Sequence, residues 1–182
     1  MRHIIVVDVE TTGLGLNPTI LEVAAKDLMT DRVLSFIPNV PSSCWAGLDP
    51  QAMAINRYFE RGSWRDMLTP TETSDSYAEL RDMLDGNTFA GSNPSFDSKL
   101  LALNGAATWH HRLLDLAAYA AGVLDLNPWE LPGLDDVAKA LGIPIPEERH
   151  GALADVELTA QCFRTLYARR AHVLRDPLRE RA

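Results

Sequence analysis

The feature that most constrains this chain is an apolar run near the N-terminus that ends in two carboxylates. Residues 3–9 read HIIVVDV, and their β-branched side chains predict a buried central strand. Asp8 and Glu10 lie at its end, and residues i and i+2 of a strand point to the same face. Two like charges side by side are unfavourable unless a proton or a cation lies between them. The run predicts either a strand that ends in solvated acids or a strand that presents a cation site.

The residues that follow favour the second interpretation. Thr11, Thr12 and Gly13 interrupt the apolar run with residues typical of a turn. We expect backbone N–H groups to be exposed in this glycine-containing turn, where they could bind a phosphate or a sugar hydroxyl beside a metal site.

The rest of the chain predicts a mixed sheet flanked by helices, the α/β class. Strands are expected over 19–28, 32–37 and 87–91, and the short link at 29–31 predicts an antiparallel hairpin. Helices are expected over 49–61, 75–84, 112–124, 133–142 and 152–171. A further helix is expected to follow the turn at Asn93 and to stop at Asn104-Gly105. Short turns between the first three strands argue against a plain doubly wound fold. We expect one domain over 1–171 and an Arg-rich C-terminal tail over 172–182.

Charge narrows the classes of function. The 182 residues include 17 Lys and Arg against 25 Asp and Glu, a formal net charge of −8. Domains that hold nucleic acid by bulk charge are usually basic, so this class is disfavoured. A site where metal ions supply the positive charge stays open.

The number of cysteines and the length of the apolar segments indicate the cellular compartment in which the protein is expected. Cys44 and Cys162 are too few for a disulfide framework and lie in no zinc-binding pattern. No stretch approaches the roughly 18 apolar residues of a membrane span. The N-terminal apolar run is too short for a signal peptide. We therefore expect a cytoplasmic protein without a membrane partner.

Two further acidic motifs lie at predicted element boundaries. In Asn93-Pro94-Ser95-Phe96-Asp97, the carboxylate of Asp97 falls in the first turn of a helix, where the helix dipole stabilises it. That explanation suffices for Asp97 in isolation.

The last motif combines a histidine with an acid. His150 lies in a loop and Asp155 early in the last helix. A loop histidine is usually a surface residue, yet its pKa near neutrality makes it a natural general base. Taken together, four carboxylates and one histidine predict a hard, oxygen-rich site suited to Mg²⁺ or Mn²⁺.

The three motifs resemble those of the DEDDh branch of the DEDD 3′–5′ exonucleases. This branch includes the proofreading epsilon subunit of bacterial DNA polymerase III, ribonuclease T and oligoribonuclease. The matching segments are DVETTG at 8–13, NPSFD at 93–97 and HGALAD at 150–155, supported by ILEVAA at 20–25 and LDDVAKALGI at 134–143. The resemblance covers roughly residues 3–167. It implies a ribonuclease-H-like fold with a five-stranded mixed sheet.

The resemblance also implies roles for the site residues. Two Mg²⁺ or Mn²⁺ ions would be held by Asp8, Glu10, Asp97 and Asp155, with Asp8 between them. His150 would accept the proton of the attacking water. The product would be a nucleoside 5′-monophosphate.

Four further residues would contact the substrate. The resemblance implies that backbone groups near Thr11 and Thr12 engage the 3′ nucleotide and that Leu14 packs against its base. It assigns Asn93 to orienting the substrate or Asp97.

The segment 38–75 departs from the family pattern and bears on substrate choice. Four of its aromatic residues could stack on bases, and we expect at least two of them to cover the core instead. They are Trp45, Tyr58, Phe59 and Trp64.

Several alternatives stay open at this stage. Expected partners are single-stranded DNA or RNA 3′ ends, with DNA favoured, and a DNA polymerase is a further candidate. The alternatives are a catalytically silent interaction domain and an RNA-specific exoribonuclease of the same fold. A metal phosphatase would need a phosphate loop or a nucleophilic Asp-x-Asp, and neither is evident. Oligomeric state is not determined by the sequence.

Overall fold

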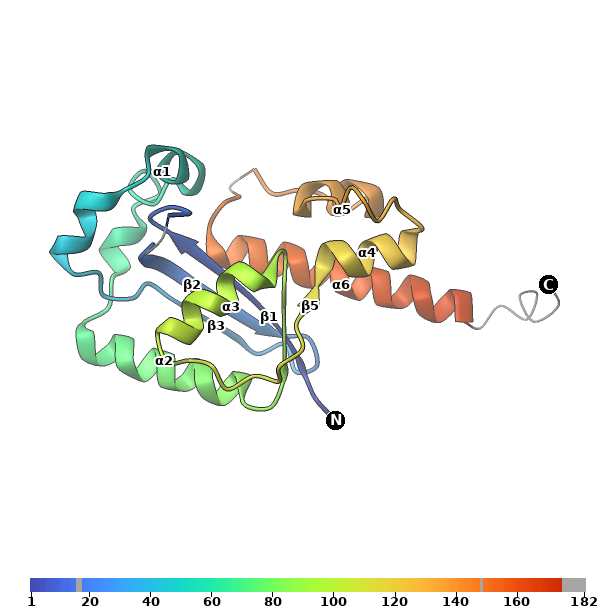
Figure 1. Ribbon diagram of the computed structural model, residues 1–182, viewed down its shortest axis with the longest axis horizontal. Coiled ribbons are helices and arrows are strands. Elements are labelled where there is room, and N and C mark those ends of the chain that lie inside the picture. The colour runs from blue at the N-terminus through green and yellow to red at the C-terminus, as the bar shows by residue number, and fades with distance from the viewer. Residues whose placement is uncertain (16–17, 148, 175–182) are drawn as a thin grey trace.

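The protein folds around a five-stranded sheet with the strand order β3-β2-β1-β4-β5 (Figure 1). The computed structural model describes residues 1–15, 18–147 and 149–174. The strands are β1 (Ile4–Thr11), β2 (Ile20–Asp27), β3 (Val33–Phe36), β4 (Thr88–Gly91) and β5 (Leu114–Asp115). Strands β1, β2 and β3 pair antiparallel, whereas β4 pairs parallel with β1 and with β5. The predicted mixed α/β sheet is confirmed.

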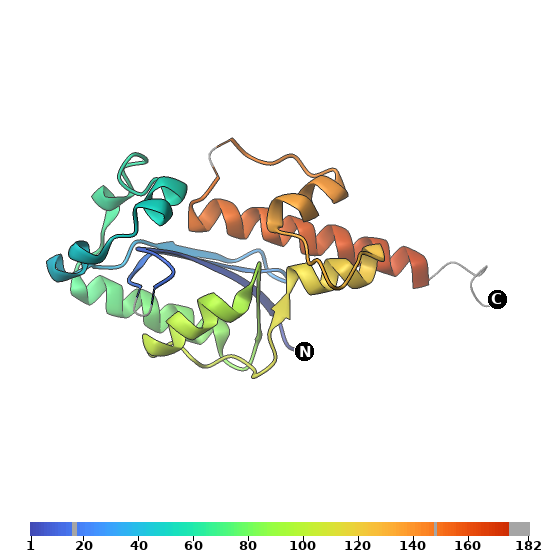
Figure 2. The same ribbon diagram turned by 45° about the horizontal axis from the view of Figure 1, so that its top comes forward.

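Helices cover both faces of this sheet (Figures 1 and 2). The α-helices are α1 (Pro50–Asn56), α2 (Pro70–Leu84), α3 (Pro94–Leu103), α4 (Leu116–Leu124), α5 (Leu134–Leu141) and α6 (Ala152–Leu174). Side chains of β1 alternate between the two layers, as the period of a strand requires. Ile5 and Val7 pack with residues of α2 and α3, whereas Val6 packs with residues of α4, α5 and α6. Asp8 and Glu10 continue the Val6 series, so they belong to the face that α6 covers.

Two helices differ from the sequence prediction at their ends. Helix α1 was expected over 49–61, but it ends at Asn56 because Arg57 adopts the left-handed conformation, with φ 50°. Helix α2 begins at Pro70 rather than at residue 75. The Thr69 side chain accepts a hydrogen bond from the Glu72 N–H, and the Glu72 side chain binds the Thr69 backbone in return. Because of this capping box, the helix begins more than one turn earlier than predicted.

The fifth strand was missed in the helix expected over 112–124. Leu114 and Asp115 pair parallel with Ala90 and Gly91 of β4, and α4 begins only afterwards. The Asp115 side chain accepts a hydrogen bond from the Ala118 N–H at 2.9 Å and caps that helix. An Ala-rich sequence has high helix propensity, but pairing with an existing strand edge overrides propensity over two residues.

The C-terminal helix α6 extends to Leu174, past the expected boundary at residue 171. Residues 175–182 of the predicted tail lie outside the described residues. Within the described ranges, none of the helices combines the length and the apolar character needed to cross a membrane.

Candidate functional site

Three carboxylates from distant parts of the chain converge at the end of β1. Oxygen atoms of Asp8, Glu10 and Asp155 all lie within 4.8 Å of one another. The first two come from alternate positions of β1, and the third comes from the first turn of α6, which packs over that face of the sheet. The structure therefore brings together three of the four predicted metal-ligating acids.

The electrostatics of this cluster favour a bound cation. Burial is the main cause that raises the pKa of Asp8 well above its usual value, followed by the charges of Asp97, Glu10 and Asp155. Burial together with the charges of Asp155 and Glu22 raises the pKa of Glu10 to about 8. Carboxylate oxygens are the donors that Mg²⁺ and Mn²⁺ prefer, and a divalent cation would offset the mutual repulsion. The donor set fits the predicted metal.

Asp97 lies beside this group at the start of α3 and is 4% exposed. Its Oδ1 atom accepts a hydrogen bond from the backbone N–H of Val9 at 3.0 Å, between the two acids of β1. Burial raises the pKa of Asp97 to about 7, while the N–H of Val9 opposes that rise. The hydrogen bond to β1, and not only the helix dipole, thus accounts for its position.

Asn93 begins α3 in the left-handed conformation with φ 62°, and its side chain is exposed. Its Oδ1 atom accepts a hydrogen bond from the Ser95 hydroxyl at 2.9 Å. The side chain therefore shapes the turn before α3 and is open to solvent at the same edge of the sheet as Asp97.

His150 occupies the turn just before α6 and is half-buried. Its backbone has φ 69°, a left-handed conformation that is uncommon for a residue with a side chain. Among the described residues, the group of ligand atoms within 4.8 Å consists of carboxylates and does not include this imidazole. The histidine thus stands next to the cluster in the chain without being part of it.

The turn after β1 differs from its prediction. Thr11 and Thr12 are buried, and the Thr12 N–H donates to the Thr19 carbonyl at 2.9 Å. The Gly13 N–H donates to the Thr11 hydroxyl at 3.3 Å. Both N–H groups are therefore used inside the fold, contrary to the exposed groups that the sequence predicted. Leu14 is 78% exposed at the tip of this turn.

Sequence reasoning missed the arginine that binds the cluster. The Nε atom of Arg149 lies 3.1 Å from Asp155 Oδ1, and the same guanidinium pairs with Asp135 at the start of α5. Its charge lowers the pKa of Asp8. The position of Arg149 directly before His150 was the signal in the sequence that could have pointed to this residue.

The ion pair between Glu22 and Arg61 was also missed. Glu22 lies on β2 directly opposite Glu10, and its carboxylate pairs with the Arg61 guanidinium. Asn56 binds the same region, because its Nδ2 donates to the Thr11 carbonyl at 3.0 Å. The segment 38–75 is thereby attached to the first motif by polar contacts that no local sequence pattern indicated.

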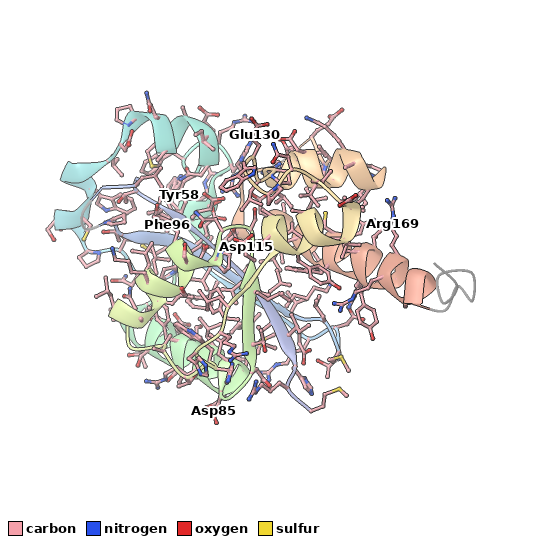
Figure 3. The ribbon with its side chains drawn as sticks, turned by 45° about the vertical axis from the view of Figure 1, so that its right-hand side comes forward. Tyr58, Asp85, Phe96, Asp115, Glu130 and Arg169 are labelled. Carbon is pink, nitrogen blue, oxygen red and sulfur yellow. The ribbon has the colours of Figure 1, made fainter. Side chains whose placement is uncertain are left out.

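The aromatic residues of this segment divide into two pairs. Tyr58 is fully buried beside the α1 segment (Figure 3). Trp45 is half-buried against it, with ring centroids 6.2 Å apart. Phe59 and Trp64 are 47% and 44% exposed. The prediction that at least two of the four cover the core is confirmed.

A comparison with models of known families identifies the family of this chain. The family model for exonucleases of the RNase T type matches residues 5–163. The chain belongs to this exonuclease family. The resemblance to DEDDh exonucleases is therefore confirmed. No match was found among curated proteins.

Solved structures agree on the ribonuclease-H-like exonuclease fold. A 3′-exonuclease that recognises the 3′ end of a histone mRNA stem-loop has a TM-score of 0.67 at 12% identity, over 92% of this chain and 64% of that one. Escherichia coli Exonuclease I in complex with a dT13 oligonucleotide has a TM-score of 0.64 at 20% identity, over 96% and 43%. Schizosaccharomyces pombe Pop2p, in a form with Mg²⁺ and Mn²⁺, has a TM-score of 0.57 at 14% identity, over 88% and 81%. This chain thus spans less than two thirds of the first two proteins.

Proposed function

We propose that this protein is a divalent-metal-dependent 3′–5′ exonuclease that acts on single-stranded nucleic acid, with DNA favoured. The observation that carries the proposal is the convergence of Asp8, Glu10 and Asp155 within 4.8 Å. The raised pKa values of Asp8 and Glu10 give a physical reason for a bound cation at this cluster. Membership in the exonuclease family supports phosphodiester hydrolysis as the reaction.

In this proposal, each acid has a defined task. Asp8, Glu10 and Asp155 hold the divalent ions directly, and Asp97 supports the site from its hydrogen bond to Val9. Such ions, when bound, activate a water molecule and stabilise the negative charge on the leaving oxygen.

His150 acts as the general base in the proposed reaction. It accepts the proton of the water that attacks the phosphorus, and the bond to the 3′ oxygen of the preceding nucleotide breaks. The product is a nucleoside 5′-monophosphate and a strand shorter by one nucleotide. The exposed Leu14 packs against the terminal base, and the exposed Asn93 lies at the same edge and orients the substrate. The buried Thr11 and Thr12 hold the turn that carries Leu14.

The net charge of −8 is compatible with this activity. Four of the acids belong to the proposed metal site, so their charges are not available to repel the substrate once cations are bound. The acidity disfavours only tight binding driven by bulk charge. An enzyme that holds a short 3′ end and releases it after each cleavage suits this charge.

The experiment that tests the proposal compares matched DNA and RNA oligonucleotides carrying a 5′ label. With Mn²⁺ or Mg²⁺, we expect a ladder shortened from the 3′ end and release of 5′-monophosphates, faster on DNA. EDTA and a 3′-blocked oligonucleotide are the controls. Faster degradation of RNA would favour an exoribonuclease of the same fold, and no degradation of either strand would favour a silent interaction domain.

A further inference from the structure

Arg61 connects the segment around α1 to the strand next to the metal site. It lies in the turn after α1, and its Nε donates to the Asn56 carbonyl at 2.8 Å. Its guanidinium pairs with Glu22 of β2. The Arg61 side chain is 25% exposed and that of Glu22 is 9% exposed. The carboxylate is therefore buried while its arginine reaches it from a partly exposed position, and loss of the arginine would leave a buried charge without its partner.

The same guanidinium lies directly over the glycine of the third motif. A Cβ atom placed on Gly151 would be 2.6 Å from the Nη1 atom of Arg61. Any larger residue at position 151 would therefore push the arginine away. The contact places the guanidinium against the residue that follows His150. In Figure 2 the α1 segment and the loop before α6 both lie above the sheet, as this contact requires.

Glu22 completes the connection to α6. Its Oε2 atom accepts a hydrogen bond from the Ala152 N–H at 3.4 Å, at the first residue of that helix. The first N–H groups of a helix have no partner within the helix, so a carboxylate from another strand can cap them. Two successive residues, Gly151 and Ala152, thus contact the Glu22–Arg61 pair.

We propose that Arg61 is a positioning residue that holds the turn carrying His150 and the start of α6 in register with the acids of β1. The inference rests on the proposed function, because His150 and Asp155 are its general base and metal ligand. Arg61 acts through Glu22 and Gly151 and does not contact the reacting atoms. The segment 38–75 therefore contributes to catalysis by fixing this turn, besides any contribution to substrate choice.

The first test compares Arg61→Ala with Arg57→Ala. The control residue lies on the same segment and pairs with Glu60 at the surface. Misplacement of a catalytic group by about 1 Å can cost roughly 100-fold, so we expect kcat to fall about 10- to 100-fold in Arg61→Ala with KM within about 3-fold. Arg57→Ala should match the wild type. Equal kcat in both variants, or a rise in KM alone, would overturn the proposal.

The second test reaches the same contact from the other side. Gly151→Ala should displace the guanidinium and reproduce the kcat of Arg61→Ala, and the double variant should be no slower than either single variant. Gly122→Ala is the control, because a Cβ there would have no atom within 4 Å. Additive losses in the double variant would show two independent effects and would contradict a single link.

The third test does not depend on activity. Hydrogen exchange of the amides at 151–155 should be faster in metal-free Arg61→Ala, and also in Arg61→Lys, than in the wild type or in Arg57→Ala. Lysine keeps the charge but lacks the fork that contacts Asn56 and Glu22 together. Unchanged exchange in both variants would overturn the proposal. A wild type without nuclease activity would contradict the proposed function and leave this measurement decisive for Arg61.

Discussion

Two glutamates that lie opposite each other on β1 and β2 have different surroundings. Glu22 of β2 pairs with Arg61 and accepts a hydrogen bond from the Ala152 N–H. Glu10 of β1 faces Asp8 and Asp155, and its pKa rises to about 8. Both lie on the same face of the sheet, since cross-strand partners share a face. The fold places an arginine beside Glu22, whereas it places other acids around Glu10.

This difference separates an acid that is paired within the protein from an acid that lies among like charges. A buried carboxylate with an arginine and an N–H donor stabilises the positions of its partners. A carboxylate among other carboxylates destabilises the metal-free protein and gains a role only when a cation binds. In the proposed function, the β1 end of the sheet is therefore the metal-binding end, and the Glu22–Arg61 pair on β2 helps to hold it in place.

Asp8→Asn should have the largest effect. We expect metal-dependent hydrolysis to be abolished, because the acid central to the cluster is lost. The melting temperature without metal should rise by about 2–4 °C, because asparagine mimics the neutral form that the raised pKa favours. Oligonucleotide degradation and calorimetry in EDTA measure the two effects.

Glu22→Gln is the matched change at the other end, and it should lower the melting temperature because Arg61 loses its charged partner. Full activity in Asp8→Asn would contradict the proposed role of the β1 acids. Changes of melting temperature with the same sign in both variants would contradict the difference between these acids and Glu22.

His150→Ala should lower kcat by roughly two to four orders of magnitude, the usual contribution of a general base. Binding of Mn²⁺, measured by calorimetry, should stay unchanged because the imidazole lies outside the carboxylate group. His111→Ala is the control, since His111 is exposed and its ring only contacts that of His110, with centroids 4.1 Å apart. An unchanged rate in His150→Ala at neutral pH would show that another group activates the water.

The pH dependence of stability should report the acid cluster directly. The pKa values of Glu10 and Asp97 rise to about 8 and about 7 in the folded protein, above their usual values of 4.5 and 3.8. Their contribution to stability is therefore full below the usual values and is lost as pH rises through about 7 to 8. In EDTA, we expect the melting temperature to fall by several degrees between weakly acidic and weakly alkaline pH.

Two measurements sharpen this expectation. Glu10→Gln should flatten the pH dependence, and saturating Mg²⁺ should restore stability at alkaline pH because it binds the ionised carboxylates. A melting temperature that rises with pH in EDTA would contradict the assignment of unpaired acids to the β1 end.

Leu14→Ala should have the smallest effect. The side chain is 78% exposed at the turn after β1, so its truncation should leave folding intact. Loss of its contact with the terminal base should raise KM by roughly 3- to 10-fold without changing kcat. Leu103→Ala is the matched control, as Leu103 is 73% exposed at the end of α3. A fall in kcat alone would place Leu14 in a different role.

Local sequence patterns predicted most elements but not their ends. The apolar run at 4–7 and the hairpin link at 29–31 determined the first strands, because burial and turn preference act over a few residues. Helix α2 begins earlier than expected because the Thr69–Glu72 capping box and Pro70 at the first helical position together start it there. Strand β5 was missed because its two residues become a strand only through pairing with β4.

The candidate site divides in the same way. The types and spacing of Asp8, Glu10, Asp97, Asp155 and His150 were available from the chain, since each lies in a short motif. The arginines beside these acids could not be predicted from the sequence. Arg61 and Arg149 are distant in the chain or in no recognised motif, and they pair with Glu22 and Asp155 only in the folded protein.

The sequence by itself determined the acidic chemistry and the exonuclease family, since both depend on residue types at fixed local spacing. Only the tertiary structure decided which acids are neutralised by the protein and which are left together. That decision depends on contacts between β1, β2, the α1 segment and α6, and long-range packing sets the burial and the charge around each carboxylate.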